Sequence, residues 1–349
     1  MKTKIPHFLL FLLCLLFARP AFPRAHGATA APRRIFGVYV YDSMGHGTIP
    51  SGWHNQAQRG CDPITNATRR QDAVAFLCDP ANAVAVAKLS CNPLLKNNAT
   101  YFPVYVDMVK QLSAAGVAVH LMVSDTPDSF LTYQSAFHAA VDALSEAVPA
   151  ARIGISYDVE GAVSGSAKLW SETYAIMIDY AERSAARRPS TWGGFTFWGT
   201  KNAGVALYQH ANAIEWGKYF AGDLDSINVA LKDIVGFNDT ARLSLGLELG
   251  TEKGIGCATF AECTGSLMWG RGVDSTKQAT LADWVAQVLL PRVEALGFPQ
   301  GRLSDEAPFY VESLAGYMAF QRNIQARRLP CTSCTKSEQN EAQFWCRAV

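Results

Sequence analysis

The stretch Ile153-Gly154-Ile155-Ser156-Tyr157-Asp158-Val159-Glu160 alternates strictly between two kinds of residue. The odd-numbered positions are apolar or aromatic, and the even-numbered positions are small or acidic. Side chains of a strand point alternately to two faces, so this pattern predicts a strand with one apolar face and a second face that carries two carboxylates. We expect the rest of the chain to be organised around that second face.

The same inverted alternation recurs twice in the later part of the chain. In Leu243–Glu248 three leucines alternate with Ser244, Gly246 and a final Glu248, and Phe309–Glu312 again ends on an acid. Helix-covered strands that close into a barrel bring such residues together at the carboxyl-terminal rim, where barrels of this kind carry their functional groups. The acids are therefore predicted to meet at one rim.

Predicted strands alternate with predicted helices along the whole central part of the chain, which indicates an α/β fold with a parallel sheet. The expected strands are 35–41, 83–89, 117–124, 152–160, 193–198, 226–231, 243–249 and 308–312. The expected helices are 101–115, 129–148, 168–188, 205–220, 280–296 and 315–328. Residues 42–82 are expected to be a Gly-, Pro- and Cys-rich excursion, and 329–349 a Cys-rich tail. Eight strands favour a (β/α)8 TIM barrel over residues 33–328. An open, doubly wound sheet is the alternative, but Ser43–Gly47 does not match a glycine-rich phosphate loop.

The composition and the amino terminus predict a secreted protein. Among 349 residues, 31 Lys and Arg nearly balance 30 Asp and Glu, which argues against a broad nucleic-acid-binding surface. Residues 1–27 combine two early lysines, the apolar run Phe8–Ala18 and a small-residue cleavage site, as a signal peptide does. That run is too short to span a bilayer. The carboxyl terminus has no hydrophobic tail of the kind that signals a lipid anchor, so no such anchor is expected.

Sequons and cysteines agree with a secretory compartment. The predicted glycosylation sites are Asn66, Asn98 and Asn238. Removal of the signal leaves eight cysteines, an even number that predicts disulfide-bonded loops and a disulfide-bonded tail with undetermined pairing. They are Cys61, Cys78, Cys91, Cys257, Cys263, Cys331, Cys334 and Cys346. Cys331 and Cys334 also fit a redox or zinc motif, although no histidine at ligand spacing accompanies them.

The carboxylates are the candidate catalytic groups. Asp158 and Glu160 lie two residues apart on one strand and so point the same way, and a carboxyl group buried beside another is kept protonated near neutrality, as a general acid requires. Cleavage of a glycosidic bond needs two such groups, and Glu248 on another strand is the candidate second one. The alternative interpretation is that each acid pairs with a Lys or Arg across the barrel.

Aromatic residues gather at the predicted strand ends, where they are candidate platforms for the apolar faces of sugar rings. The candidate substrate-binding residues are Tyr39, Tyr41, Trp198, Asn228, Tyr310 and Glu312. Packing in the barrel core is the alternative role for the aromatic ones. The predicted partner is therefore a carbohydrate.

Other chemistries lack their motifs. The sequence contains no G-x-S-x-G elbow and no H-E-x-x-H, and its histidines form no ligand cluster, so no metal or cofactor is expected. A phosphodiesterase barrel that uses His46 and His120 remains an alternative, and His120 is otherwise expected to be a core residue.

The fourth predicted strand resembles the D-x-x-D-x-D-x-E signature of family 18 glycoside hydrolases, which are chitinase-like barrels. Asp158 and Glu160 match its last two acids, whereas Ile153 and Ser156 stand at the first two positions. Leu245–Gly250 is similar to the strand-seven segment of that family. The resemblance implies that Glu160 is the proton donor and that Asp158 orients the N-acetyl group of the substrate, which acts as internal nucleophile.

A second resemblance is to retaining glycosidases with glutamates at the ends of strands four and seven, here Glu160 as acid/base and Glu248 as nucleophile. The expected function is thus a secreted glycoside hydrolase-like protein, and the family 18 resemblance implies that N-acetylated sugars are its substrates. The alternative is a catalytically inactive, lectin-like barrel that binds glycans, and the acids absent at Ile153 and Ser156 favour it.

Overall fold

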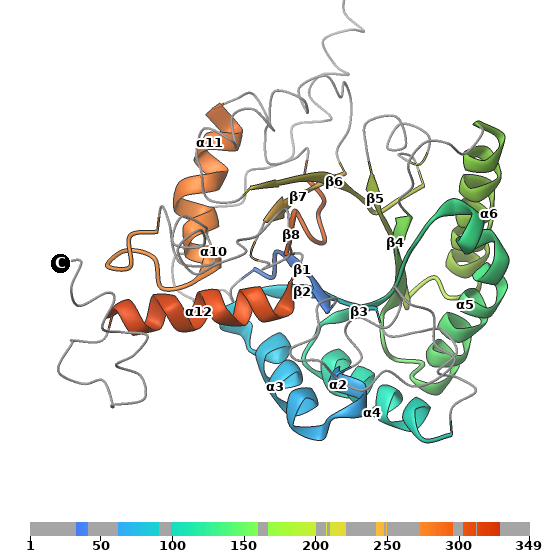
Figure 1. Ribbon diagram of the computed structural model, residues 1–349, viewed down its shortest axis with the longest axis horizontal. Coiled ribbons are helices and arrows are strands. Elements are labelled where there is room, and N and C mark those ends of the chain that lie inside the picture. The colour runs from blue at the N-terminus through green and yellow to red at the C-terminus, as the bar shows by residue number, and fades with distance from the viewer. Residues whose placement is uncertain are drawn as a thin grey trace, which may run out of the picture. The chain divides into compact units, whose positions relative to one another are not determined.

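Eight parallel strands pair in chain order and close into a barrel, because β8 pairs with β1 as well as with β7 (Figure 1). The strands are β1 (Phe36–Val40), β2 (Val84–Leu89), β3 (Ala118–Asp125), β4 (Ile153–Val159), β5 (Trp192–Gly199), β6 (Ala213–Phe220), β7 (Leu243–Leu247) and β8 (Phe309–Val311). The computed structural model describes residues 33–40, 62–90, 99–159, 167–199, 207, 210–220, 242–247, 249, 273–295, 303–311 and 313–328. The predicted (β/α)8 barrel is confirmed.

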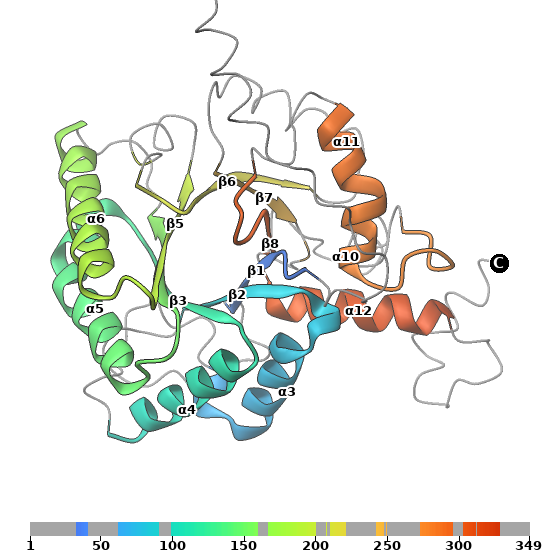
Figure 2. The same ribbon diagram turned by 180° about the vertical axis from the view of Figure 1, so that it is seen from behind.

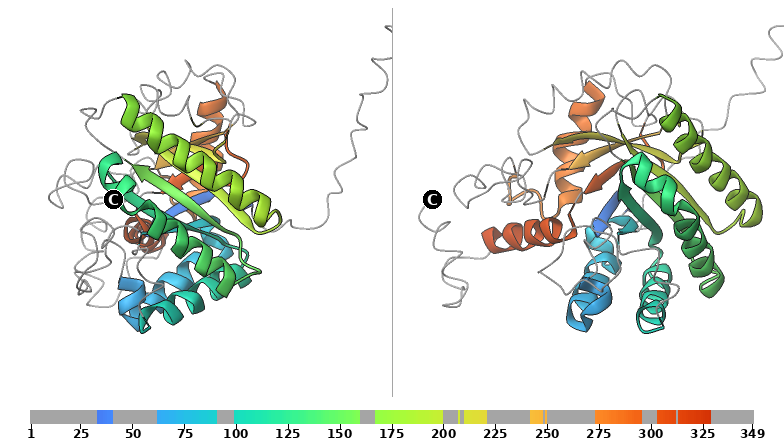
Figure 3. Two further views of the ribbon diagram at one scale, coloured as in Figure 1. Left: turned by 90° about the vertical axis from the view of Figure 1, so that its right-hand side faces the viewer. Right: turned by 45° about the vertical axis from the view of Figure 1, so that its right-hand side comes forward.

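Helices cover the outer face of the barrel (Figures 2 and 3). They are α2 (Asp62–Thr65), α3 (Ala67–Cys78), the 3-10 turn η1 (Pro80–Asn82), α4 (Tyr101–Ala114), α5 (Pro127–Ala147), α6 (Ala167–Arg187), α10 (Leu281–Trp284), the π-helical turn η4 (Val285–Leu289), α11 (Leu290–Ala295) and α12 (Leu314–Arg328). Five of these helices pack on strands of the barrel: α3 on β2, α4 on β3, α5 on β3 and β4, α6 on β5, and α12 on β1. Across the described residues, no helix is both long and apolar enough to cross a membrane.

The sixth strand lies elsewhere than the sequence predicted. Residues 213–220 form β6 and not the second half of a helix over 205–220, so this part of the prediction is wrong. Its sequence carries Ile214 and several aromatic residues, which favour a strand, and Gly217, which weakens a helix. The preceding Asn212 also joins the segment to β5, since its side chain accepts a hydrogen bond from the backbone N–H of Phe195. The strand expected at 226–231 lies outside the described residues.

The excursion expected over 42–82 contains a helix that the sequence analysis missed. The side chain of Asn66 accepts a hydrogen bond from the backbone N–H of Arg69 and so caps the amino terminus of α3. Ala73, Val74 and Leu77 are buried on one side of this helix. The Gly- and Pro-rich composition belongs to the preceding residues, whereas 67–78 contain neither residue type and are free to form a helix.

The helix expected over 280–296 is continuous but changes its winding. Thr280 and Asp283 form a reciprocal capping box at its start. At Leu290 the backbone N–H bonds to the carbonyl of Val285, five residues back, and the next residue, Pro291, has no N–H to donate. The π-helical turn therefore lies directly before the proline, where the regular hydrogen-bond ladder cannot continue.

The two faces of β4 divide as the alternation predicted. Its odd-numbered side chains are fully buried in the large core between barrel and helices, in contact with α5. The side chains on the other face, among them Ser156 and Asp158, are inside the barrel and are also buried. The apolar face is thus the outer one and the polar face is the inner one.

Candidate functional site

The candidate site begins at the carboxyl-terminal rim, because all eight strands are parallel and end on the same side of the barrel. Asp158 is the penultimate residue of β4, and its side chain is buried with 8% exposure. Tyr157 pairs with Phe197 in the register between β4 and β5. Asp158 and Trp198 are therefore the next residues along these neighbouring strands. A carboxylate and an aromatic ring thus take corresponding positions on neighbouring strands near the rim.

An aromatic cluster lies inside the barrel. Tyr39 of β1, Met122 of β3 and Tyr310 of β8 are buried in contact with one another, and the partly buried Trp198 packs against them. The ring centroids of Tyr39 and Tyr310 lie 5.8 Å apart at an interplanar angle of 52°. Three of the predicted substrate-binding residues are thus brought together. Tyr39 and Tyr310 retain 3% and 0% exposure, so Trp198 is the aromatic ring of this cluster with surface left for a ligand.

An ion pair crosses the barrel next to these rings. Lys88 of β2 contacts the carboxylate of Glu215 of β6, and both side chains are 1% exposed. These two strands lie four places apart in a ring of eight, so they face each other across the interior. The hydroxyl of Tyr39 donates a hydrogen bond to the other carboxylate oxygen of Glu215.

The environment of Lys88 is strongly unfavourable to a charged amine. Its Nζ atom lies 4.5 Å from the centroid of the Tyr39 ring and 5.4 Å from that of Tyr310. Burial lowers the pKa of Lys88 well below its ordinary value, and the carboxylates of Asp158 and Glu306 oppose this effect. The favourable contacts of the cation with two ring faces and with carboxylates therefore work against its desolvation.

Sequence reasoning missed both members of this pair. Lys88 was passed over inside the apolar run 83–89, and Glu215 was assigned to a helix over 205–220, whereas it lies in β6. Signals for both were present, because a lysine in an otherwise apolar strand is unusual and Glu215 stands between Ile214 and Trp216 in an alternating segment. Sequence alone could not show that the two side chains meet.

His120 of β3 is a core histidine inside the barrel, as expected. Its Nε2 lies 3.0 Å from the carbonyl oxygen of Gly193. Burial and the neighbouring Lys88 lower the pKa of His120 to about 3, so the imidazole is neutral. Gly154 leaves room for it, since a Cβ atom there would lie 2.7 Å from Nε2. This geometry disfavours the phosphodiesterase alternative, whose other histidine, His46, is outside the described residues. Within the described part of the chain, no cluster of His, Cys, Asp and Glu could hold a metal ion.

The two positions at which family 18 enzymes carry further acids have other roles here. Ile153 is 0% exposed and packs outward in the large apolar core. Ser156 points into the barrel, and its hydroxyl accepts a hydrogen bond of 3.0 Å from the hydroxyl of Thr196 on β5. Neither position supplies a carboxylate next to Asp158.

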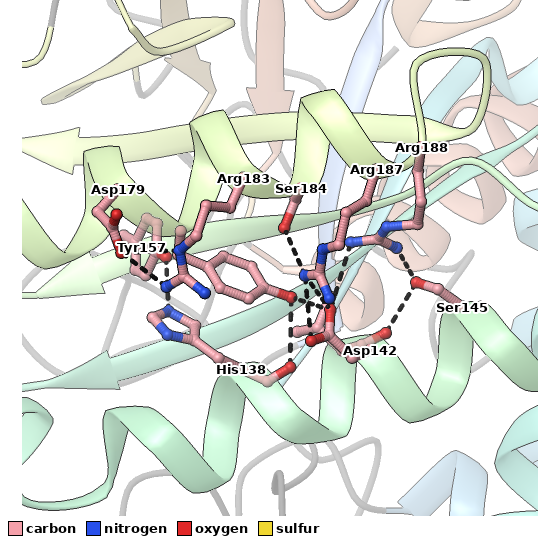
Figure 4. Close-up of polar contacts among 11 residues, drawn as sticks. His138, Asp142, Ser145, Tyr157, Asp179, Arg183, Ser184, Arg187 and Arg188 are labelled. Carbon is pink, nitrogen blue, oxygen red and sulfur yellow. Dashed lines mark hydrogen bonds and ion pairs between the residues drawn. The ribbon is translucent and has the colours of Figure 1, made fainter.

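A second polar network lies on the outer face of β4 (Figure 4). The hydroxyl of Tyr157 lies 2.9 Å from Nε2 of His138 on α5. The His138 ring stacks on Tyr180 of α6 at a centroid distance of 3.8 Å. Tyr180 in turn donates a hydrogen bond of 2.8 Å to Asp142, which also pairs with Arg187. These contacts tie the strand that carries Asp158 to two helices.

Several predicted site residues lie outside the described part of the chain and stay predictions. They are Tyr41, Glu160, Asn228, Glu248 and Glu312, the sequons at Asn98 and Asn238, and Cys61, Cys91, Cys257, Cys263, Cys331, Cys334 and Cys346. Asn66 is exposed at the amino terminus of α3.

Cys78 differs from the predicted disulfide, because it carries a free thiol. Its Sγ atom lies 3.8 Å from the carbonyl oxygen of Gln111, in the contact between α3 and α4. Partial burial raises the pKa of this thiol, and the charge of Arg34 opposes the rise. Cys78 is half-buried at the carboxyl end of α3, where its side chain packs between the two helices.

Comparisons with known proteins find a likeness in structure but none in sequence. No protein-family model matches the chain. A search of curated protein sequences gives no match either. Similar solved structures include a chitinase from Bacteroides thetaiotaomicron, with 10% identity, a TM-score of 0.44 and coverage of 84% of this chain and 95% of that one. They also include a family 18 chitinase from Pseudoalteromonas aurantia, with 11% identity, a TM-score of 0.43 and coverage of 73% and 94%.

A malate synthase from Haloferax volcanii is similar as well, with 9% identity, a TM-score of 0.41 and coverage of 91% of this chain and 81% of that chain. Chitinases and a malate synthase catalyse different reactions. These likenesses transfer neither a substrate nor a reaction to this chain.

Proposed function

We propose that the chain is a glycoside hydrolase-like protein that acts on N-acetylated sugars, with Asp158 and Glu160 as its catalytic carboxylates. One observation carries this proposal: Asp158 points into a closed barrel near the carboxyl-terminal rim, and the partly exposed Trp198 takes the corresponding position on the neighbouring strand β5. A sugar needs an aromatic surface for its apolar face and a carboxylate for the reacting bond. Asp158 and Trp198 on neighbouring strands would supply both.

In the proposed reaction the N-acetyl oxygen of the substrate attacks the anomeric carbon while the bond to the leaving sugar breaks. Glu160, two residues after Asp158 in the sequence, gives its proton to the departing oxygen. Asp158 accepts a hydrogen bond from the N-acetyl N–H and so holds the carbonyl oxygen in position to attack. Water then opens the cyclic intermediate and returns a proton to Glu160, which yields the free sugar with retained configuration.

The lack of acids at positions 153 and 156 favours a second candidate function, a lectin-like barrel that binds such sugars without cleaving them. Ile153 is committed to the apolar core and Ser156 to a hydrogen bond with Thr196. No acid at these positions shares a proton with Asp158. The binding surface at Trp198 would serve both functions, and only turnover separates them.

The test is hydrolysis of an aryl glycoside of N,N'-diacetylchitobiose by the purified protein and by three variants. Asp158→Asn and Glu160→Gln should each lower kcat by about 10²- to 10⁴-fold, the range that a general acid contributes. Glu248→Gln is the matched control and should change kcat little. Saturable binding of the sugar without turnover would favour the lectin-like function. A loss in Glu248→Gln as large as that in Glu160→Gln would favour the retaining pair of Glu160 and Glu248.

We also propose that the protein matures in the secretory pathway, on the strength of residues 1–27 and the three sequons. Intact-mass analysis of the protein secreted by a eukaryotic host checks this. The expected product lacks the first 27 residues and carries glycan, with Asn66 as the sequon whose exposed position is described. A product that retains its amino terminus and lacks glycan would contradict the proposal.

A further inference from the structure

The ion pair between Lys88 and Glu215 has no explanation in stability alone. The interior of such barrels is usually filled by layers of branched aliphatic side chains. Taking two charges out of water costs several kcal/mol per ion, and replacing a buried pair by apolar residues is often neutral or stabilising. Both members are nevertheless sealed inside this barrel. A pair that stability does not require points to a role in the neighbouring site.

The surrounding residues make room for this pair. A Cβ atom at Gly37 of β1 would lie 2.9 Å from Cε and 3.3 Å from Nζ of Lys88, so a residue other than glycine would displace the lysine. The chain thus uses a glycine where the lysine crosses the interior.

The pair acts on Tyr39 at two points. Glu215 accepts the hydrogen bond from the Tyr39 hydroxyl, while Nζ of Lys88 lies over the face of the same ring. One contact fixes the tip of the side chain and the other fixes the plane of its ring. Tyr310 is held in the same way from one side, by Lys88 and by its contact with Tyr39.

Trp198 is the neighbour of both Glu215 and the two tyrosines. Trp198 and Glu215 pair in the register of β5 and β6, so their side chains point to the same face of the sheet as neighbours. The Trp198 ring also packs against the buried cluster of Tyr39, Met122 and Tyr310. Any movement of Tyr39 or Tyr310 would remove the support on which this partly exposed ring rests.

We propose that Lys88 and Glu215 are a positioning pair, which fixes Tyr39 and Tyr310 and thereby holds Trp198 in the orientation that stacks on a sugar ring. The identity of the ligand rests on the proposed function, but the positioning itself does not. Among the described residues, the charged and titratable groups around the pair are Asp158 at the rim, His120 on β3, the two tyrosines and Glu306 before β8.

The experiment compares the full-length protein with the double variant Lys88→Met/Glu215→Met, labelled with 5-fluorotryptophan for ¹⁹F NMR. The Trp198 resonance is assigned by its loss in Trp198→Phe. In the double variant this resonance should shift and broaden while the protein remains folded, because the cluster loses its anchor. Asp179→Met/Arg183→Met removes an exposed ion pair that touches none of the cluster and should leave the resonance unchanged.

Titration with the tetramer of N-acetylglucosamine then measures the consequence for binding. The double variant should bind about tenfold more weakly than the parent protein, as expected for loss of one aromatic stacking contact. Tyr39→Phe keeps the ion pair and removes only the hydrogen bond that the Tyr39 hydroxyl donates to Glu215. This variant should move the Trp198 resonance in the same direction by less. This variant tests the proposal even if the double variant does not fold.

An unchanged Trp198 resonance in a folded double variant, or in Tyr39→Phe when the double variant is unfolded, would overturn the positioning role. If the parent protein does not respond to the sugar, the proposed ligand is wrong. The spectra recorded without sugar still decide whether the pair positions Trp198.

Discussion

The inner and outer sides of the barrel wall each carry a buried polar network, and the two networks differ in their access to water. Inside, Lys88, Glu215 and Tyr39 form a closed group with almost no exposed surface. Outside, the contacts of Tyr157 and His138 continue through Asp142 to Arg187, whose side chain is 51% exposed (Figure 4). The inner charges must be neutralised within the protein, whereas the outer ones are partly neutralised by solvent.

This difference determines how much each charged contact contributes to the free energy of unfolding. An exposed ion pair contributes about 0–1 kcal/mol, because water already screens both partners. A buried charge that loses its partner keeps its whole desolvation cost. The same chemical contact should therefore have a large effect inside the barrel and a small one on the helices.

The largest effect is expected from breaking the inner pair on one side only. Glu215→Gln leaves Lys88 without its anionic partner and should lower the free energy of unfolding by about 3–5 kcal/mol. Arg183→Ala is the control, because it removes an exposed pair with Asp179 and should cost at most about 0.5 kcal/mol. Urea unfolding at pH 7 measures both. Similar losses in the two variants would show that exposure does not separate the two regions.

Acid should destabilise the protein through His120 and His138, which are both buried. Burial lowers the pKa of His138 from 6.5 to about 4, with Arg183 adding to this effect and with Asp142 and Asp179 opposing it. The folded state therefore prefers the neutral ring, and the stability this contributes is complete above pH 6.5 and is lost as the pH falls to about 4. The shift corresponds to about 3 kcal/mol. For His120 inside the barrel the loss continues to about pH 3.

Urea midpoints measured between pH 7 and pH 4 check this prediction. His138→Phe keeps an aromatic ring against Tyr180 but cannot take up a proton, so its stability should fall less steeply over this range. The same slope in the variant and the parent protein would mean that His138 does not titrate in the folded state as described.

The smallest effect is expected from the hydrogen bond in the outer network. Tyr157→Phe removes the hydroxyl that contacts Nε2 of His138 and leaves this nitrogen buried without that partner. The expected cost is about 1 kcal/mol, because the ring keeps its packing against α5 and only one hydrogen bond is lost. Thermal or urea unfolding at pH 7 measures it. A loss as large as that of Glu215→Gln would contradict the view that the outer network is the weaker one.

The sequence by itself determined the α/β class, the barrel and the inner face of β4. Strict alternation in Ile153–Val159 and in Leu243–Leu247 specified which side chains face the helices, because a strand has a period of two residues and each face has one environment. It also placed Asp158, Trp198, Tyr39 and Tyr310 on strands of one barrel, since the strand to which a residue belongs is a local property.

Only the tertiary structure decided which strands complete the ring and which side chains meet inside it. The segment Ala213–Phe220 begins after an alanine-rich stretch that favours a helix, and its pairing with β5 and β7 prevailed over that local preference. Lys88 and Glu215 are 127 residues apart in the numbering of the chain, and each alone appears as an isolated charge in a strand. Their contact depends on the closure that sets β2 opposite β6, and no local pattern encodes the distance across a barrel.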